Sequence, residues 1–483
     1  MNIRMIAYLI GQMLRVESAL MLLPLLCNFI YREDNLIAFL VPIVLLAALG
    51  TALTFKMPKN RNIYAKEGFV IVGISWILLS LFGAMPFLIS GVIPHFCDAF
   101  FETVSGFTTT GASILRDVET LPKSMLFWRS FTHWIGGMGV LVFTLAVLPR
   151  ANERSMRLMH VMRAEVPGPV VGKLVARIKS TARILYGIYI TLTALEILLL
   201  LPKMPLFDAL CTAFGTAGTG GFGIWNDSIA HYGSVYVDAV VSLFLVLFSM
   251  NFNLFYLLLL GHIRPVLRNT ELRCFLGIVS VATLTIAIDI RHLYPGLLKP
   301  FRYAFFQVMT IISTAGFSTA NFNDWPVFSR TVLVLLMFIG ACAGSTGGGI
   351  KVGRIVLLCK SFVREIRHML HPRSVNVIRI DGKRVEEETI QGALTYMATY
   401  LFLFSAAVVA LSAFDNFDMI TNFTAAAACF NNIGPGLELV GPNGNYWLFT
   451  DASKYILSFT MLAGRLELFP MLVLFSPSTW KNH

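Results

Sequence analysis

The sequence has few charged residues: Asp, Glu, Lys and Arg together make up 13% of its 483 residues. A soluble globular protein carries about 25% charged residues and about 45–50% apolar ones. This chain is 56% apolar, and its mean hydropathy is +0.71. The composition excludes an ordinary soluble domain and indicates a protein that is largely embedded in a membrane.

The residue patterns of most metal and catalytic sites are also missing. The seven cysteines are scattered without C-x-x-C spacing, so we interpret them as small apolar residues. The nine histidines form no cluster with acidic residues or a nucleophile, which disfavours a polytopic membrane enzyme. The glycine-rich run from Gly344 to Lys351 lacks the Gly-Lys-Ser/Thr ending of a phosphate-binding loop and interrupts an apolar segment.

What the sequence does contain is a short motif that occurs four times, with a glycine beside small or hydroxyl residues after an apolar stretch. The copies are Thr108-Thr109-Thr110-Gly111-Ala112, Gly218-Thr219-Gly220-Gly221-Phe222, Ser313-Thr314-Ala315-Gly316-Phe317 and Asn431-Asn432-Ile433-Gly434-Pro435. Three copies share an upstream register. Ala99-Phe100-Phe101 precedes Gly111 at the distance at which Ala304-Phe305-Phe306 precedes Gly316, and Ala209, within Asp208-Ala209-Leu210, keeps that distance from Gly221.

Apolar runs around these motifs predict about ten membrane spans, each near the ~20 residues that cross a bilayer. Two spans, 5–31 and 36–55, precede the first motif. The spans that flank the four motifs in pairs are 68–92 and 124–148, 182–201 and 233–260, 274–293 and 326–359, and 391–413 and 447–475. Between the spans of each pair lies a shorter segment that ends at the motif: 97–109, 206–219, 300–314 and 418–432. These short segments cannot cross the membrane at ~1.5 Å per residue, so we expect them to enter and return.

The predicted fold is an all-α polytopic membrane protein with four span–pore-helix–span repeats around a central pore, preceded by two extra transmembrane helices. The expected units are 1–60 for the two N-terminal helices, and 61–150, 151–265, 266–375 and 376–483 for the four pore repeats. The alternative is that the glycines only let membrane helices pack closely. Four glycines in one register, each after a short segment, favour the pore.

The distribution of charge predicts the orientation in the membrane. The loops that join the repeats are rich in Lys and Arg, as cytoplasmic loops are, so both termini are expected in the cytoplasm. The outer loops are expected to carry Asp98, Glu102, Asp117, Glu119, Asp227, Asp324, Asp415, Asp418 and Glu438. The formal net charge of +11 is then a feature of the inner face. Membrane lipid is therefore the expected surrounding, and nucleic-acid binding is the weaker explanation because the basic residues sit in short loops.

The four motifs have the chemistry of a cation filter. Glycines at 111, 221, 316 and 434 can adopt conformations that turn successive carbonyl oxygens toward an axis, where they replace the hydration shell of an ion. Anions would need Arg or Lys, and divalent cations would favour a carboxylate ring. The predicted filter residues are Thr108, Thr109, Thr110, Gly111, Thr219, Gly220, Gly221, Ser313, Thr314, Ala315, Gly316, Asn431, Asn432, Ile433 and Gly434.

Two details of the filter have alternatives. The polar residues two positions before each glycine (Thr109, Thr219, Thr314 and Asn432) either extend the column of ligands or serve only the local turn. In the second repeat, Gly218 lies in a Thr-Ala-Gly triplet like that of the third filter. The shared register selects Gly221 instead.

The second span of the third repeat contains a candidate gate. A run of glycine and hydroxyl residues disfavours continuous helix there and, below a filter, could block the inner pore. The predicted gate residues are Gly344, Ser345, Thr346, Gly347, Gly348 and Gly349. The alternative is a helix break that serves only packing.

Three ionisable residues fall inside expected spans. Arg465 lies within the last span and provides either a positive barrier near the pore or a structural partner for Glu467 or a filter carbonyl. Arg129 and His133 lie nearer the outer end of their span and are expected to matter less.

With these residues identified, the chain resembles the Trk branch of the Trk/Ktr/HKT superfamily of potassium transporters over essentially its whole length. The motifs that carry the resemblance are Gly-Phe-Thr-Thr-Thr-Gly-Ala (106–112), Gly-Gly-Phe (220–222), Thr-Ala-Gly-Phe (314–317), Asn-Asn-Ile-Gly-Pro-Gly (431–436), Gly-Ser-Thr-Gly-Gly-Gly-Ile-Lys (344–351), Ala-Glu-Val-Pro-Gly-Pro (164–169) and Gly-Arg-Leu-Glu (464–467). Glycine at all four filter positions resembles the potassium-selective members. The glycines on either side of Thr219 depart from the pattern and would loosen selectivity.

The resemblance implies potassium uptake through a multi-pass protein of the bacterial inner membrane, with potassium as substrate and no cofactor in this chain. It also implies a homodimer with one pore per subunit, and a cytoplasmic nucleotide-binding regulatory subunit of the TrkA type. The gate role falls on residues 340–350, and Arg465 matches the family's intramembrane arginine. A symporter that couples potassium to sodium or protons remains an alternative, with outer Asp and Glu residues as candidates for a second ion site.

Overall fold

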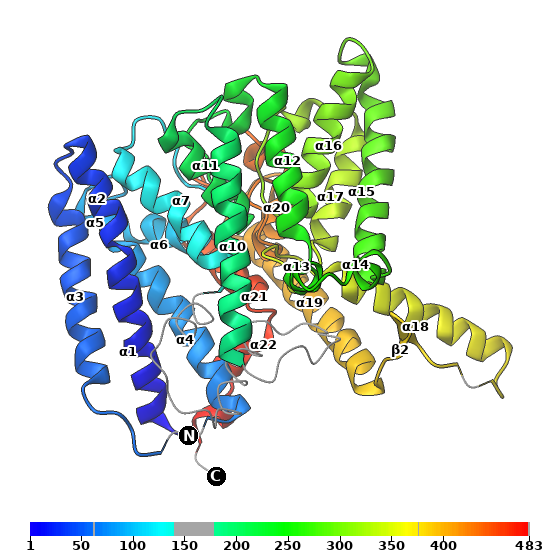
Figure 1. Cartoon of the computed structure of the whole chain (residues 1–483), viewed down its shortest axis with the longest axis horizontal. Helices are drawn as coiled ribbons and strands as arrows, with labels where there is room; N and C mark the ends of the chain where they lie inside the picture. Colours follow the sequence, from blue (N-terminus) through cyan, green and yellow to red (C-terminus); the bar gives the residue numbers. More distant parts are fainter. Residues whose placement is uncertain (61–62, 140–177, 375, 482–483) are drawn as a thin grey trace.

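The structure is a computed structural model that describes residues 1–60, 63–139, 178–374 and 376–481 (Figure 1). The described chain is mainly helical, and its one sheet is a two-stranded hairpin. Because no backbone polar group can be left unbonded in lipid, helices are the expected solution for such an apolar sequence. The predicted all-α fold is therefore confirmed.

A helical hairpin formed by α1 (Ile3–Leu20), α2 (Leu22–Tyr31) and α3 (Leu36–Thr54) precedes the repeats. Residues 3–31 and 36–54 are each long and apolar enough to cross a membrane, as predicted for the two extra spans. The helices cross closely at Gly11 and Gly50, where a Cβ on Gly50 would lie 2.8 Å from the carbonyl oxygen of Gly11. Small residues permit such close backbone approach in membranes.

Four sets of helices follow. Each set contains a long first helix, then a short helix, and then a second helix (α7, α12, α17 or α21), together with some shorter elements. The first set is α4 (Ala65–Gly83), α5 (Met85–Ile89), α6 (Phe96–Phe107) and α7 (Lys123–Gly137). The second is α10 (Ile178–Leu200), α11 (Leu206–Gly218), η1 (Ser228–Tyr232), α12 (Val235–Ser249), α13 (Phe252–Leu259) and α14 (Ile263–Leu267). The third is α15 (Thr270–Asp289), η2 (Ile290–His292), α16 (Leu298–Ile312), η3 (Phe322–Asp324), α17 (Val327–Ile339) and α18 (Val352–Leu370). The fourth is α19 (Glu387–Phe414), α20 (Met419–Phe430), η4 (Glu438–Val440), α21 (Asp451–Arg465), α22 (Phe469–Phe475) and α23 (Pro477–Trp480).

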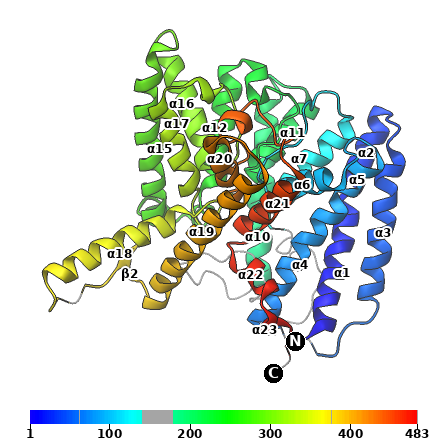
Figure 2. The same cartoon turned by 180° about the vertical axis from the view of Figure 1, so that it is seen from behind.

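The four short helices are α6, α11, α16 and α20, and each ends within two residues of the predicted segment end. Their last turns are buried, because the longer helices surround them. The second helix of each set contacts the short helix of the next: α7 with α11, α12 with α16, α17 with α20, and α21 with α6. Figure 2 shows α21 beside α6, where the last set meets the first. The sets therefore close a cycle.

The prediction of a continuous second span is wrong in the second and fourth repeats. In the second, α12 and α13 meet at an angle of 91° after Ser249. Asn251 caps α13 there by accepting a hydrogen bond from the N–H of Asn253. In the fourth, α21 ends at Arg465, and positive φ angles at Glu467 and Leu468 separate it from α22. Arg465 is therefore the last residue of a helix and not the middle of a span.

In the third repeat the expected break is present, since α17 ends at Ile339 and α18 begins at Val352. In the first, α7 ends at Gly137, and the rest of the expected span from residue 140 lies outside the described residues. These breaks explain why six described helices, or seven with the bent pair, meet the length and hydropathy of a membrane span. The expected number of about ten counted interrupted runs as single helices.

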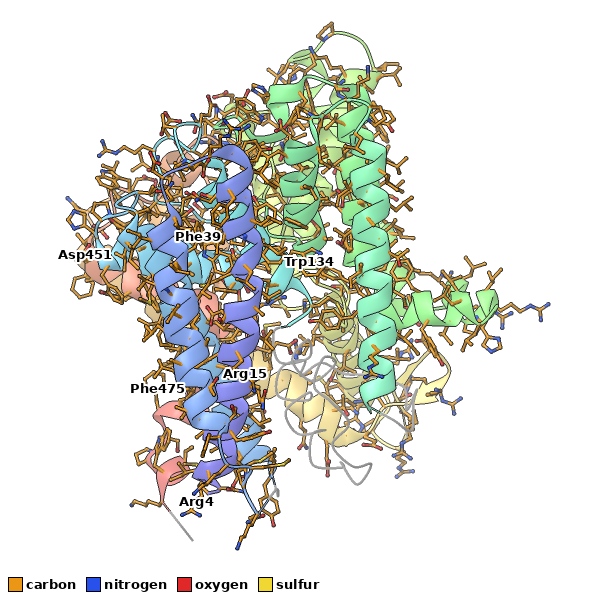
Figure 3. The ribbon with its side chains drawn as sticks, turned by 60° about the vertical axis from the view of Figure 1, so that its left-hand side comes forward. Arg4, Arg15, Phe39, Trp134, Asp451 and Phe475 are labelled. Atoms are coloured by element: carbon orange, nitrogen blue, oxygen red, sulfur yellow. The ribbon has the colours of Figure 1, made fainter. Side chains whose placement is uncertain are left out.

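The outward faces of the long helices are apolar, as a lipid-facing surface requires. Exposed examples are Val44 on α3, Val281 on α15 and Phe402 on α19. Figure 3 shows the side of the N-terminal hairpin, where Phe39 is buried in the core that the hairpin shares with the first and fourth repeats. Figures 1 and 2 place both chain termini at one end of the molecule.

The strands β1 (Arg379–Ile380) and β2 (Lys383–Arg384) form a hairpin around the Asp381-Gly382 turn. Asp381 and Gly382 both have positive φ, as the tight turn requires. The carboxylate of Asp381 accepts hydrogen bonds from the N–H of Thr270 at 2.7 Å and from the amide of Asn269 at 3.0 Å. The hairpin is therefore attached to the first turn of α15.

Candidate ion-binding site

Each of the four short helices ends in the same hydrogen-bonded turn. The N–H of the residue before the predicted filter glycine donates to the carbonyl five residues back, and the preceding N–H donates to the carbonyl three residues back. The longer-range bonds are Thr110 N to Ser105 O (2.9 Å), Gly220 N to Gly215 O (2.8 Å), Ala315 N to Thr310 O (2.8 Å) and Ile433 N to Ala428 O (2.8 Å). This pair of bonds defines the Schellman motif at a helix C-terminus.

The backbone after the four helices also repeats residue by residue. Thr109, Thr219, Thr314 and Asn432 have φ angles of 55°, 53°, 63° and 56°. Two positions later Gly111, Gly221, Gly316 and Gly434 have φ angles of 79°, 75°, 79° and 95°. The left-handed conformation costs a residue with a Cβ roughly 1–2 kcal/mol, so the surrounding structure must hold the first set in place.

The polar side chains at the first of these positions contact different groups: the local turn for Thr219, the first repeat for Asn432 and the predicted gate segment for Thr314. Thr219 donates its hydroxyl to the carbonyl of Gly218 at 2.6 Å, and Asn432 donates its amide to the hydroxyl of Thr110 at 3.0 Å. Thr314 accepts a hydrogen bond from the N–H of Gly348 at 2.7 Å.

The four glycines pack against one another's segments in a closed ring. A Cβ on Gly111 would lie 2.0 Å from the carbonyl oxygen of Gly220, and one on Gly221 would lie 1.8 Å from that of Ala315. A Cβ on Gly316 would lie 2.0 Å from the carbonyl oxygen of Ile433, and one on Gly434 would lie 2.6 Å from that of Thr110. Each glycine thus faces the carbonyl that precedes the next glycine, and the fourth segment returns to the first.

This geometry explains why glycine stands at these four positions. The φ angle is one that side chains disfavour, and the space of a Cβ is occupied by the next segment's carbonyl. Gly218 is different, because it is the last residue of α11 and has no positive φ. Gly221 therefore occupies the backbone position of the other three, in agreement with the register seen in the sequence.

The predicted gate segment lies directly against the predicted filter segments of the third and fourth repeats. A Cβ on Gly347 would lie 2.8 Å from the carbonyl oxygen of Ser313, and one on Gly348 would lie 2.5 Å from that of Asn431. With the Thr314–Gly348 hydrogen bond, these approaches place residues 347 and 348 at the helix ends that precede two of the four filter glycines.

Backbone contacts join the gate segment to the break between α12 and α13. Cys342 and Thr346 donate N–H bonds to the carbonyls of Ser249 and Phe248 at 3.1 and 3.3 Å. In return, Phe252 donates its N–H to the carbonyl of Gly344 at 3.0 Å. The bend in the second repeat thus supplies the hydrogen-bonding groups that the non-helical gate segment needs inside the membrane.

One half-buried carboxylate, that of Glu271, holds both ends of the predicted gate segment. Oε1 of Glu271, in the first turn of α15, accepts the N–H of Ala343 at 2.7 Å and that of Gly353 at 2.8 Å. Lys351 adds a bond from its ammonium group to the carbonyl of Gly347. These hydrogen bonds therefore hold the two ends of the segment close together.

Arg465 bridges the gate segment and the first repeat. Nη1 donates to the carbonyl of Thr346 at 2.7 Å, and Nη2 donates to the carbonyls of Gly136 and Gly137 at 2.6 and 2.8 Å. Glu467, considered from the sequence as a partner of Arg465, forms an ion pair with Arg354 of α18. The guanidinium of Arg465 therefore bonds backbone carbonyls of both the predicted gate segment and the end of α7.

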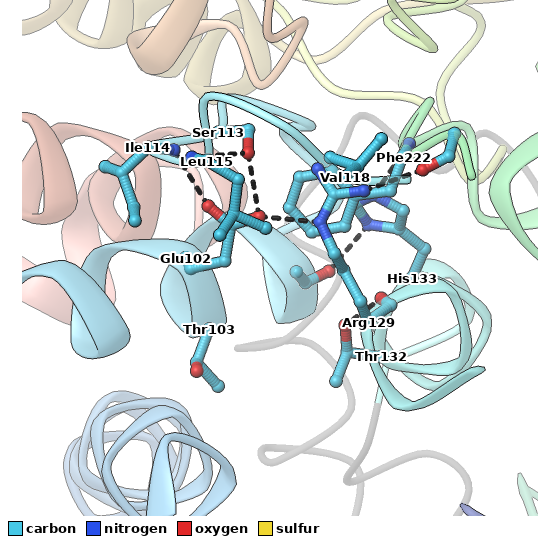
Figure 4. Close-up of polar contacts among 12 residues, drawn as sticks. Glu102, Thr103, Ser113, Ile114, Leu115, Val118, Arg129, Thr132, His133 and Phe222 are labelled. Carbon is cyan, nitrogen blue, oxygen red and sulfur yellow. Dashed lines mark hydrogen bonds and ion pairs between the residues drawn. The ribbon is translucent and has the colours of Figure 1, made fainter. Parts of the chain in front are cut away.

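Arg129 and His133 were expected to matter less, but they bond Gly223 and Phe222, directly after the predicted filter residues of the second repeat (Figure 4). Nη1 of Arg129 donates to the carbonyl of Gly223 at 2.8 Å, and Nε2 of His133 accepts the N–H of Phe222 at 3.2 Å. Arg129 is ion-paired with Glu102 at 2.6 Å. The available signal was that two polar residues four apart share a face of a membrane helix.

The acidic residues assigned to the outer loops each have a hydrogen-bond or ion-pair partner within the protein. Asp98 and Glu102 lie on α6, where they are buried and ion-paired with Lys454 and Arg129. Hydrogen bonds or ion pairs also engage Asp117, Glu119, Asp227, Asp324, Asp415, Asp418 and Glu438. The amide of Asn226 lowers the pKa of Asp117 by bonding its carboxylate.

Comparisons with known proteins agree with this architecture. The TrkH family profile, described as a cation transport protein, matches residues 36–482. The Trk system potassium uptake protein TrkH of Salmonella typhimurium is 36% identical over 490 residues, which cover 100% of both chains. The Trk system potassium uptake protein TrkG of Escherichia coli is 32% identical and covers 100% of this chain and 99% of its own.

The fold is also that of a solved transporter. The crystal structure of the potassium transporter TrkH from Vibrio parahaemolyticus superposes with a TM-score of 0.89, at 33% identity and with 100% of both chains covered. These relatives are named as transport proteins and not as enzymes. The chain belongs to the TrkH family of cation transport proteins.

Proposed function

We propose that this protein takes up potassium across the bacterial cytoplasmic membrane through the ring formed by Gly111, Gly221, Gly316 and Gly434. The observation that carries the proposal is the closure of that ring, in which each glycine faces the carbonyl before the next one. Its relatives are named as potassium uptake proteins. Carbonyl oxygens from four segments can replace the hydration shell of a monovalent cation.

The proposed filter uses backbone oxygens and hydroxyl or amide side chains, with no carboxylate among them. The oxygens come from residues 108–111, 219–221, 313–316 and 431–434. Such uncharged oxygens suit a weakly hydrated monovalent cation and not a divalent one. Potassium is thus the proposed substrate, and the chain needs no cofactor for this function.

The proposed gate is the segment from Gly344 to Gly349, which closes the pathway below the filter. Its contacts with Ser313, Thr314 and Asn431 support this position. Arg465 would stabilise the closed state through its bond to Thr346 and would oppose cation passage by its charge. Opening then requires the hydrogen bonds at Thr346 and Gly348 to break.

The proposal includes the partners and topology that the family resemblance implies. The protein would act as a homodimer in lipid, with a cytoplasmic nucleotide-binding subunit of the TrkA type controlling the gate. Both termini would lie in the cytoplasm, and their position at one end of the molecule supports this (Figure 1). The proposed units are 1–60, 61–150, 151–265, 266–375 and 376–483; the boundaries at 150 and 375 fall at residues outside the described ranges, and the boundary at 265 falls inside α14.

A coupled symporter is the alternative considered from the sequence. A symporter of this kind would need carboxylates on the outer side to bind the coupled sodium ion or proton. The nine acidic residues assigned to the outer side each have a hydrogen bond or an ion pair within the protein. These contacts give no observation that favours the symporter.

Ion flux into liposomes tests the proposal. Purified protein, with and without a regulatory subunit, should carry more potassium than sodium, and Gly316→Ser should lose this preference because its side chain meets the carbonyl of Ile433. Gly277→Ser is the matched control, since Gly277 on α15 of the same repeat has open space at its Cβ. If no potassium moves above the level of empty liposomes, or if Gly316→Ser stays selective, the proposed filter is wrong.

A further inference from the structure

The filter of the second repeat contains more glycine than the other three, at positions 218, 220, 221 and 223. The space beside Gly218 and Gly220 is filled by one residue of another repeat. A Cβ on Gly218 would lie 2.3 Å from the carbonyl oxygen of His133, and one on Gly220 would lie 2.3 Å from its Nδ1. Because Gly218 and Gly220 have no side chains, the His133 ring has room to lie beside the filter segment.

His133 makes two hydrogen bonds that fix its ring and its tautomer. Nε2 accepts the N–H of Phe222 at 3.2 Å, so the proton is on Nδ1, which donates to the carbonyl of Gly106 at 2.8 Å. The imidazole is fully buried and joins the last turn of α6 to the residue after Gly221. It thus couples the first and second filter segments.

Arg129, one turn earlier on α7, makes a parallel connection. Nε donates to Glu102 at 2.6 Å, Nη1 donates to the carbonyl of Gly223 at 2.8 Å, and the guanidinium lies 3.6 Å from the ring centroid of Phe222. Glu102 in turn accepts the N–H of Ile114 at 2.9 Å and the hydroxyl of Ser113 at 3.0 Å. Both residues of the pair are buried (Figure 4).

Other repeats hold the outer end of their filter from their own short helix. Glu102, nine residues before Gly111, bonds Ile114, and Gln307, nine residues before Gly316, donates to the carbonyl of Ala320 at 3.4 Å. In the fourth repeat, Thr424 accepts the N–H of Leu437 at 2.9 Å. In the second repeat, the residue nine positions before Gly221 is Thr212. The bonds to Phe222 and Gly223 come instead from α7 of the first repeat.

We propose that Glu102, Arg129 and His133 form a brace that sets the selectivity for potassium over sodium by fixing the outer end of the second filter. The inference deepens the proposed function and rests on it. Sodium is smaller than potassium, so carbonyl oxygens must move inward to coordinate it well. A filter with four glycines bends easily, and the brace opposes that movement at Phe222 and Gly223. These three are positioning residues, because they act through the filter backbone.

The experiment measures potassium and sodium flux in liposomes for the double variant Glu102→Gln with Arg129→Gln, and for His133→Asn. The double variant removes both charges together, so that no unpaired charge is buried. Losing charge-assisted bonds to the filter should lower the potassium-to-sodium flux ratio at least about tenfold. His133→Asn removes the acceptor for Phe222 and should lower the ratio less, because Arg129 remains.

The matched control is Asp98→Asn with Lys454→Gln, because this pair is also buried and ion-paired on α6 and α21. The control should keep the wild-type flux ratio even if its melting temperature falls. If the brace variants lose stability but keep the wild-type ratio, the brace is only structural and the inference is overturned. If the wild-type protein shows no preference for potassium, the proposed function fails instead.

Discussion

At the residue scale, the four glycines of the proposed filter share one backbone position but differ in the space left for a side chain. The space for a Cβ is smallest at Gly221, where the nearest carbonyl oxygen would be 1.8 Å away, and largest at Gly434, where it would be 2.6 Å away. Gly111 and Gly316 lie between these two, at 2.0 Å. Real Cβ atoms do not approach an oxygen closer than about 3 Å, so every substitution displaces a carbonyl, by different amounts.

This difference predicts a rank order for alanine substitutions. Gly221→Ala should reduce potassium flux at least about tenfold more than Gly434→Ala, because the larger displacement adds to the roughly 1–2 kcal/mol cost of a Cβ at positive φ. Flux per folded protein in liposomes, with size-exclusion profiles for folding, measures the effect. Equal losses in the two variants would contradict a cost that depends on the space at each glycine.

At the element scale, the short helices could be predicted and the breaks in the second helices could not. The segments 97–109 and 206–219 correspond closely to α6 and α11, because their apolar runs are bounded by turn residues. The bend after Ser249 has neither Gly nor Pro in the sequence Ser249-Met250-Asn251. It exists because Phe248, Ser249 and Phe252 bond the gate segment almost 100 residues later, and such tertiary bonds leave no periodic signal.

The gate segment itself predicts an effect of Glu271. Glu271→Ala removes the acceptor of two backbone N–H groups, each worth about 1.5–3 kcal/mol when the acceptor is charged. The loosened segment should raise potassium flux without a regulatory subunit at least about tenfold. Glu271→Gln keeps an acceptor oxygen at the same place and should remain close to the wild-type protein. The comparison is a flux assay in liposomes without the proposed regulatory subunit.

The outcome that would contradict this prediction is equal flux from Glu271→Ala and the wild-type protein at equal reconstitution. An increase in both Glu271→Ala and Glu271→Gln would assign the effect to the lost charge and not to the hydrogen bonds.

At the scale of the whole molecule, the positions of the four ring glycines could be predicted from the sequence, but the side chains that hold their segments in place could not. The register of Gly111, Gly221 and Gly316 follows from the repeated spacing, because each short helix is a local structure of fixed length. His133 and Phe222, in contrast, are 89 residues apart, and their hydrogen bond depends on how α7 packs against α11. The brace could therefore be recognised only once the repeats had been arranged in space.

The arrangement of the whole molecule in the membrane gives the last prediction. Figure 1 places the segment between α11 and α12 at one end of the molecule, and the hairpin of β1 and β2 with both termini toward the other. The basic loops predict that the second end faces the cytoplasm. Asp227→Cys should therefore react with a membrane-impermeant maleimide in intact cells, whereas Lys383→Cys should react only after permeabilisation; both side chains are exposed.

Cys359 is the exposed natural cysteine among the described residues, so both variants are made in a Cys359→Ser background that should itself stay unlabelled. Reaction of Lys383→Cys in intact cells would mean that the hairpin faces outward. The gate segment would then lie on the outer side of the filter, and control of potassium entry by a cytoplasmic partner would be excluded. Labelling of Asp227→Cys alone would place the filter toward the outside and the gate toward the cytoplasm, as regulated uptake requires.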